Sequence, residues 1–217
     1  MATISEETSG EVAERHGGRY LDASRDVVLR ETALALLAEV GYERLTMDAV
    51  AARAHAGKTT IYRRWAGKAE LVVDALKCAK GDFEFPDTGS LRKDLRMVAQ
   101  HAAEPHNRFD AEVTVGIITA LAHDAELRMV FREQLLDPQL RGFREVFERA
   151  VDRGEIPEGR DLDLLAALFP ALVLQQVVTS GEIPDAELAQ RMMDEVIFPL
   201  ATAPTGTTRR DAAAADA

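Results

Sequence analysis

Basic and hydroxyl side chains gather in one short segment of the chain, residues 46–71, in a pattern that suits contact with a polyanion. No acidic residue lies between Asp48 and Glu70, although the 217-residue chain carries a formal net charge of −11. Nucleic acid lying against the segment would explain this local reversal of charge. An ordinary solvated helix face is the alternative. The basic residues in the interval are Arg53, Lys58, Arg63, Arg64 and Lys68.

A helix expected over about 58–65 would sort the side chains of this segment into two faces. Ile61 and Trp65 share one face at helical spacing, so we expect them to pack inward. The outward side chains have the chemistry for base contact, because Arg and Lys prefer guanine and Thr offers a hydroxyl and a methyl group. The candidates for base contact are Lys58, Thr59, Thr60 and Arg63.

The elements that must position this helix are bounded by capping and turn residues. Ser24 predicts the start of a preceding helix, and Gly41 predicts its end through a positive φ. Thr46 predicts the N-cap of the next helix. His-Ala-Gly at 55–57 predicts a tight turn before the outward-facing helix, and a longer helix is expected over 68–79.

The rest of the chain predicts further helices and no sheet. Ala, Leu, Glu and Arg dominate, while β-branched runs are sparse, which favours an all-α protein. After a linker at 81–89, we expect helical segments at 90–104, 111–123, 125–154, 161–180 and 185–201, the third of them with a possible break at Pro138.

The residues from Asp26 to Leu76 resemble the DNA-binding domain of the TetR (tetracycline repressor) family. His55 and Ala56 stand where the family usually has Gly and Val, and Gly57 replaces a capping Ser. The positions that carry the resemblance are Gly41-Tyr42, Thr46, Val50-Ala51, Ala54-His55-Ala56-Gly57, Ile61-Tyr62, Arg64-Trp65 and Lys68 with Leu71.

The resemblance implies a domain organisation and a set of phosphate contacts. It implies an all-α fold, with an N-terminal three-helix, homeodomain-like helix-turn-helix domain and a C-terminal helical domain for ligand binding and dimerisation. Tyr62, Arg64 and Lys68 would contact phosphates, and Thr46 would either do the same or serve as a cap alone. The expected divisions are a flexible arm at 1–22, the DNA-binding domain at 23–79, the regulatory domain at 80–201 and a disordered tail at 202–217.

The function that the resemblance implies is transcriptional regulation. We expect a cytoplasmic homodimer that binds a near-palindromic double-stranded DNA operator, acts as a repressor and is released by a small-molecule effector. An activator of the same fold is one alternative. A helical ligand-binding protein or enzyme that does not bind DNA is another.

Two further sites are implied in the regulatory domain. For each ligand-pocket candidate, plain core packing is the competing interpretation, and Gln175 is a candidate for the dimer seam as well. The ligand-pocket candidates are Met97, His101, Ile117, Leu121, Phe131, Phe143 and Gln175. The dimer-interface candidates are Leu164, Leu168, Leu172, Gln175, Leu188, Met192, Val196 and Leu200.

Other kinds of site find little support in the sequence. No catalytic motif is present, and no cofactor is expected. Cys78 is the single cysteine, which excludes an intramolecular disulfide. The apolar segment 164–178 is expected to be too short to span a membrane. No metal site is expected, because the spacing of the nearest candidates matches no closed zinc pattern; these are His101, Glu104, His106 and Asp110.

Overall fold

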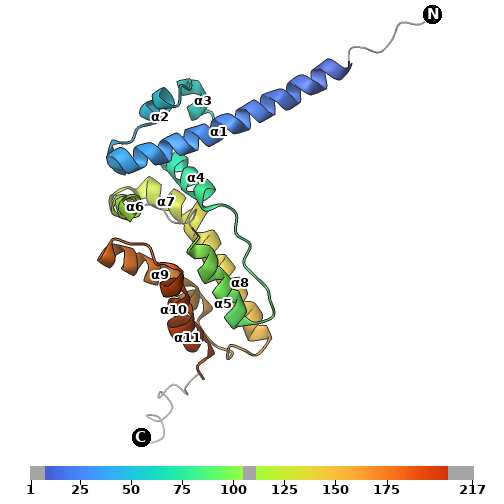
Figure 1. Cartoon of the computed structure of the whole chain (residues 1–217), viewed down its shortest axis with the longest axis vertical. Helices are drawn as coiled ribbons and strands as arrows, with labels where there is room; N and C mark the ends of the chain where they lie inside the picture. The colour runs from blue at the N-terminus through green and yellow to red at the C-terminus, as the bar shows by residue number, and fades with distance from the viewer. Residues whose placement is uncertain (1–7, 105–110, 205–217) are drawn as a thin grey trace, which may run out of the picture. The chain divides into compact units, whose positions relative to one another are not determined.

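The computed structural model describes residues 8–104 and 111–204, and for residues 8–23 and 111–112 it describes only the backbone. The described residues form helices joined by turns and loops, which confirms the all-α prediction (Figure 1). They divide into two compact units. One is formed within residues 1–78 and 116–131, and the other within residues 79–115 and 132–217.

The first unit is organised around the C-terminal half of α1 (Thr8–Arg44). Leu29, Ala33 and Leu37 recur at helical spacing and are buried, so one stripe of α1 faces the core. Gly41 has φ 75° and interrupts the helical backbone at the predicted position. The remaining helices of this unit are α2 (Met47–Arg53), α3 (Lys58–Tyr62), α4 (Lys68–Lys80), the later part of α6 (Ala111–His123) and α7 (Ala125–Phe131).

The beginning of α1 lies within residues 1–22, the span expected to form a flexible arm. The helix begins at Thr8, and residues 1–7 lie outside the described part of the chain.

The second unit is held together by an aromatic and aliphatic core. The Phe143 ring lies 5.8 Å from that of Phe169 and 6.4 Å from that of Phe147, centroid to centroid. All three side chains are buried. The helices that contribute to this core are α5 (Leu91–Ala102), α8 (Asp137–Asp152), α9 (Leu162–Ser180), α10 (Ala186–Arg191) and α11 (Phe198–Thr202).

The linker that precedes α5 packs against α8 at a glycine. A Cβ atom at Gly142 would lie 2.1 Å from the ring of Phe85, so this position has room for glycine alone unless the ring shifts. The Phe85 ring also meets Phe143 edge-on, with 5.2 Å between the centroids. The glycine therefore lets the linker ring enter the core.

Two π-helical segments interrupt the helices of the second unit, and each is followed within two residues by a proline. Residues Arg132–Leu136 precede Pro138, and residues Met192–Ile197 precede Pro199. A proline ring clashes with the carbonyl group four residues earlier in an α-helix, and a widened turn relieves that clash. The break considered at Pro138 is thus a change of helical pitch, and α8 continues through it.

Helix α9 corrects the expectation that its segment is too short to span a membrane. Its 19 residues are long and apolar enough to cross a bilayer by length and composition. One such helix is weak evidence for a membrane span, because a core helix of a soluble protein passes the same test. In this structure Leu165, Ala166 and Phe169 of α9 are buried in the core of the unit. Val177 of α9 is buried as well.

Candidate nucleic-acid interface

Helices α2 and α3 form a helix-turn-helix, and Thr46 is the N-cap of α2, as predicted. The backbone of Thr46 is extended, and its hydroxyl accepts a hydrogen bond from the amide of Ala49 at 3.1 Å. This satisfies one of the free amides at the start of α2. The side chain of Thr46 is therefore engaged as an N-cap, on the exposed side of the helix.

The turn between the two helices has a non-glycine residue in the left-handed conformation. His55 has φ 50°, the conformation that its usual glycine counterpart would adopt without strain. The amide of Ala56 donates to the carbonyl of Ala51 at 2.9 Å, which closes the end of α2. Gly57 then starts α3 as an extended N-cap with no side-chain cap bond. A Cβ atom there would meet only the hydroxyl of Thr60, at 3.7 Å.

Helix α3 is fixed by two buried residues and presents the predicted base-contact residues on its other sides. Ile61 is fully buried and Trp65 is nearly so. The Trp65 indole donates to Asp74 at 2.8 Å, and Arg30 donates to the same carboxylate oxygen at 2.7 Å. One carboxylate on α4 thus links α1 to the end of the recognition segment. The predicted residues Lys58, Thr59, Tyr62 and Arg63 are exposed, while Thr60 is half-buried.

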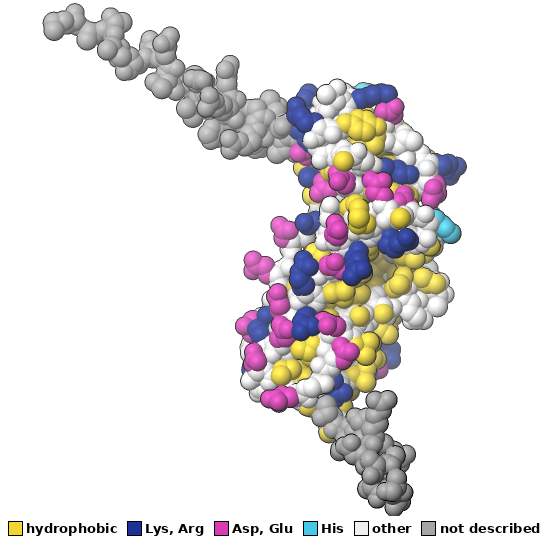
Figure 2. All heavy atoms as spheres, turned by 180° about the vertical axis from the view of Figure 1, so that it is seen from behind, with side chains coloured by type: hydrophobic (Ala, Val, Ile, Leu, Met, Phe, Trp, Pro, Cys, Tyr) yellow, Lys and Arg dark blue, Asp and Glu magenta, His cyan; other side chains and the backbone are white. Residues whose placement is uncertain are grey.

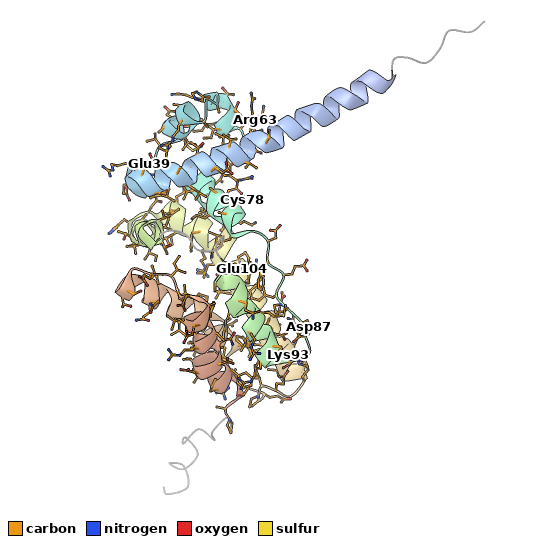
Figure 3. All side chains as sticks on the ribbon, in the orientation of Figure 1. Glu39, Arg63, Cys78, Asp87, Lys93 and Glu104 are labelled. Atoms are coloured by element: carbon orange, nitrogen blue, oxygen red, sulfur yellow. The ribbon has the colours of Figure 1, made fainter. Side chains whose placement is uncertain are left out.

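Arg63 is the C-cap of α3 and is exposed, and Figure 3 labels it beside that helix. Its backbone amide closes α3 by donating to Thr59 at 3.1 Å. Tyr62 beside it exposes about half of its surface, 51%. Arg63 and Tyr62 are therefore placed where side chains from α3 can meet an external surface.

Arg64 and Lys68, the other predicted phosphate contacts, are held by the protein itself. Arg64 pairs with Asp26 of α1, donates to the carbonyl of Thr60 at 3.2 Å and exposes only 11% of its side chain. Lys68 donates to the backbone carbonyl of Tyr42 at 3.0 Å and lies over the Tyr42 ring. Both cations contribute to the packing of α3 and α4 against α1.

Two cations from the interval between Asp48 and Glu70 form ion pairs with carboxylates that lie outside it. Arg53 makes a two-point contact with Glu39 at 2.5 and 2.6 Å, and Lys58 pairs with Asp48 at 2.6 Å. The hydrogen bond from Arg53 holds the pKa of the Glu39 carboxyl below its ordinary value. The hydrogen bond to Asp48 raises the pKa of the Lys58 ammonium. Figure 3 marks Glu39 on α1.

A polar contact that sequence reasoning did not identify joins α1 to the segment between α6 and α7. The Tyr42 hydroxyl donates to Asp124 at 3.1 Å, and the other oxygen of Asp124 accepts from the amide of Leu127 at 2.9 Å. That amide is the main cause of a lowered Asp124 pKa. Burial, together with the charge of Asp124, raises the Tyr42 pKa well above its ordinary range. The capping role of Asp124 was visible in the sequence, because Asp precedes a helical segment, but its partner 82 residues away was not.

The predicted ligand-pocket residues are divided between the two units. Ile117, Leu121 and Phe131 belong to the first unit, and Met97, His101, Phe143 and Gln175 belong to the second. Ile117 and Phe143 are buried, while Met97 and Gln175 are exposed. The His101 ring stacks on Phe83 with 3.9 Å between the centroids. His106 and Asp110, considered beside His101 as metal ligands, lie outside the described residues.

The predicted dimer residues differ in their exposure. Leu164 and Leu200 are exposed apolar residues, whereas Met192 is buried in the core of its own unit. Leu168, Leu172 and Leu188 are half-buried and pack against that core, and Val196 is half-buried as well. Gln175 is exposed, and its side-chain amide lies 3.3 Å from the Thr179 hydroxyl.

Two exposed apolar residues extend the outward face of α9 beyond the predicted set. Leu174 and Val178 follow Leu164 by ten and fourteen residues, a spacing that returns to one face of a helix. Leu164 exposes 63% of its surface and Val178 exposes 60%. Figure 2 shows hydrophobic side chains gathered in the region of these C-terminal helices, on the right-hand side of the view. A stripe of this kind is typical of an interaction surface.

Two family models match the chain. Residues 29–75 match the model described as bacterial regulatory proteins, tetR family, and residues 85–196 match the tetracyclin repressor-like C-terminal domain. A Mycobacteroides abscessus protein named DNA-binding transcriptional repressor TetR is 37% identical over 179 residues, which cover 82% of this chain and 94% of that protein.

Solved structures of low sequence identity share the fold. A putative TetR-family transcriptional regulator from Rhodococcus sp. matches with a TM-score of 0.66 and 17% identity, over 82% of this chain and 99% of that one. The Bacillus subtilis regulator FadR, solved in complex with stearoyl-CoA, matches with a TM-score of 0.61 and 21% identity, over 80% and 96%.

Proposed function

The chain belongs to the TetR family of bacterial transcriptional regulators, and from this premise we propose that it is a homodimeric repressor released from its operator by a small molecule. The relatives are transcriptional regulators, and the proposed role needs no catalytic step. The protein would act where its DNA target is, in the cytoplasm.

The presentation of α3 carries the DNA-binding part of the proposal. Ile61 and Trp65 fix the helix from beneath, and they leave Lys58, Thr59 and Arg63 exposed together. Arg63 and Lys58 have the donors that suit guanine O6 and N7 in the major groove, and Thr59 has a methyl group that suits thymine. Tyr62 has a hydroxyl that suits a phosphate.

The exposed apolar stripe of α9 supports the dimer. Two chains that meet through this stripe would bring two copies of α3 to one DNA duplex. Operator half-sites would then lie about one helical turn apart, roughly 34–36 Å, or a small multiple of that distance. The near-palindromic symmetry of such an operator follows from the two-fold symmetry of the dimer.

The effector would bind in the regulatory part of the chain and favour a dimer with wrongly spaced recognition helices. Helix α6 supports this coupling, because its first residues, up to Val115, belong to the second unit and its later residues belong to the first. A coupling free energy of about 1–3 kcal/mol gives roughly 5- to 150-fold weaker DNA binding. The name of the M. abscessus relative, a repressor, supports repression over activation.

The experiment that tests this function compares two labelled duplexes of equal length, one from the upstream region of the protein's own gene and one of shuffled sequence. Fluorescence anisotropy over a range of salt concentrations should give tighter binding to the upstream duplex. Specific binding is typically at least about 10³-fold tighter than non-specific binding. Equal affinity for both duplexes at every salt concentration would contradict a sequence-specific role.

A further inference from the structure

The first cation of the recognition helix is held by a carboxylate of the preceding helix. Lys58 opens α3, Asp48 lies in the first turn of α2, and 2.6 Å separates their nitrogen and oxygen atoms. Both side chains are well exposed, at 68% for Lys58 and 54% for Asp48. The pair therefore lies on the surface that α2 and α3 share, beside the residues placed for base contact.

Asp48 is not needed to cap α2. Thr46 already accepts the amide of Ala49, and the Asp48 carboxylate is engaged with Lys58 instead. An acidic side chain on a surface that meets DNA repels phosphates and competes with them for the neighbouring ammonium. Its presence beside Lys58 thus weakens general attraction to DNA, although in the first turn of α2 it also favours the positive end of the helix dipole.

We propose that Asp48 is a positioning residue for specificity: it holds Lys58 for base contact and withholds its charge from the phosphates of non-operator DNA. The inference rests on the proposed function. It adds a carboxylate to a surface that was expected to work through cations and hydroxyls alone.

Operator binding and non-specific DNA binding respond differently to the Lys58–Asp48 pair. Non-specific binding is almost entirely electrostatic, and each phosphate neutralised contributes about 0.9 to the slope of affinity against salt. Lys58 paired with Asp48 has little net charge to offer a phosphate. An ammonium has three donors, so Lys58 can keep Asp48 on one and still donate to guanine O6 and N7 with the others. The Lys58–Asp48 pair therefore remains formed on the operator and weakens binding to non-operator DNA.

The test uses Asp48→Asn, which keeps an acceptor for Lys58 and removes the charge. We expect Asp48→Asn to bind the shuffled duplex about three- to tenfold more tightly at low salt, with a salt slope steeper by about 0.9. Affinity for the upstream duplex should stay the same or fall, so the ratio between the two duplexes should decrease. Circular dichroism verifies that the variant keeps its helices.

Two further variants isolate the role of the pair. In a Lys58→Ala background the Asp48→Asn change should no longer alter the ratio between the duplexes, because Asp48 acts through Lys58. Glu148→Gln is the control: it removes one exposed negative charge beside Arg144 on α8, in the other unit, where Arg144 also pairs with Asp163. Glu148→Gln should leave the ratio and the salt slope unchanged.

The outcomes separate this inference from the function on which it rests. Suppose that the wild-type chain distinguishes the two duplexes. The role of Asp48 is then overturned if Asp48→Asn tightens binding to both duplexes equally, or if it behaves like Glu148→Gln. If the unchanged chain itself binds both duplexes alike, the proposed function fails first, and the inference fails with it.

Discussion

Lys68 lies over the aromatic ring of Tyr42, with its ammonium nitrogen 4.1 Å from the ring centroid and 3.0 Å from the Tyr42 carbonyl oxygen. The first residue of α4 is thereby tied to the backbone just after the Gly41 interruption of α1. A phosphate that binds Lys68 must share the ammonium with these two partners. The role of Lys68 in stability is consequently separable from any role in DNA binding.

Lys68→Ala should lower the free energy of unfolding by about 1–2 kcal/mol, because it removes a cation–π contact and a partly buried hydrogen bond to the Tyr42 carbonyl. Thermal unfolding should show a midpoint lower by about 2–8 °C. Lys93→Ala, on the exposed side of α5, is the control and should change stability by less than about 0.5 kcal/mol. A salt slope for shuffled DNA that stays unaltered in Lys68→Ala would reject its predicted phosphate contact.

Tyr42→Phe should make the protein less sensitive to alkaline pH. The pKa of Tyr42 is raised in the folded chain. The neutral hydroxyl therefore stabilises the fold at full strength below the pKa of tyrosine in the unfolded chain, about 10, and this stabilisation decreases as the pH rises above that value. A difference of one bound proton between the folded and unfolded chains changes the free energy of unfolding by about 1.4 kcal/mol per pH unit. Urea unfolding between pH 9 and about 12 should show a steeper fall for the unchanged chain; parallel curves would exclude this linkage.

Arg63→Ala should weaken binding to the upstream duplex by about 1–3 kcal/mol and weaken binding to shuffled DNA far less. The reason is that a base contact contributes on its own sequence, while a phosphate contact contributes on all sequences. Arg96→Ala, another exposed arginine in the second unit, serves as the control. Equal losses on both duplexes would assign Arg63 to the phosphates.

Leu164→Glu combined with Val178→Glu should convert a dimer into monomers, since both side chains are exposed on the α9 stripe and charges there would be buried without partners. Light scattering measures the change directly, and operator affinity should fall with it. Met129→Glu replaces an apolar residue of similar exposure, 55%, on α7 and should leave the dimer intact. A dimer that survives the double change would move the interface away from α9.

Gly142→Ala should destabilise the protein by about 1–3 kcal/mol, because its methyl group would overlap the Phe85 ring. Phe85→Leu removes that ring and should recover part of the loss when the two changes are combined. Urea unfolding of the single and double variants gives the coupling energy. Losses that simply add would show that the linker ring is not what restricts this position.

Much of the helix-turn-helix was predictable because its signals are local. Thr46 caps α2, Gly41 adopts a positive φ, and Ile61 and Trp65 are buried as their spacing indicated. Each of these depends on residues within one or two turns of helix. The same holds for the helices of the second unit, whose outer boundaries lie within about two residues of the predicted ones.

The partners of the charged side chains were not predictable, because they depend on which helices meet. Asp26, Glu39 and Asp124 lie far along the chain from Arg64, Arg53 and Tyr42, and no sequence period links them. Residues 49–69 contain no acidic side chain, so the sequence of this segment indicates no partner for its cations. The folded chain sets carboxylates against three of them.

The Tyr42–Asp124 hydrogen bond has a practical consequence for protein engineering. A DNA-binding module cut from this chain at residue 78, or grafted onto a foreign sensor domain at that point, would leave the buried Tyr42 hydroxyl without its acceptor and the first unit without residues 116–131. Functional chimeras should therefore carry the α6–α7 corner along with the helix-turn-helix. The portable unit of this regulator is discontinuous in sequence.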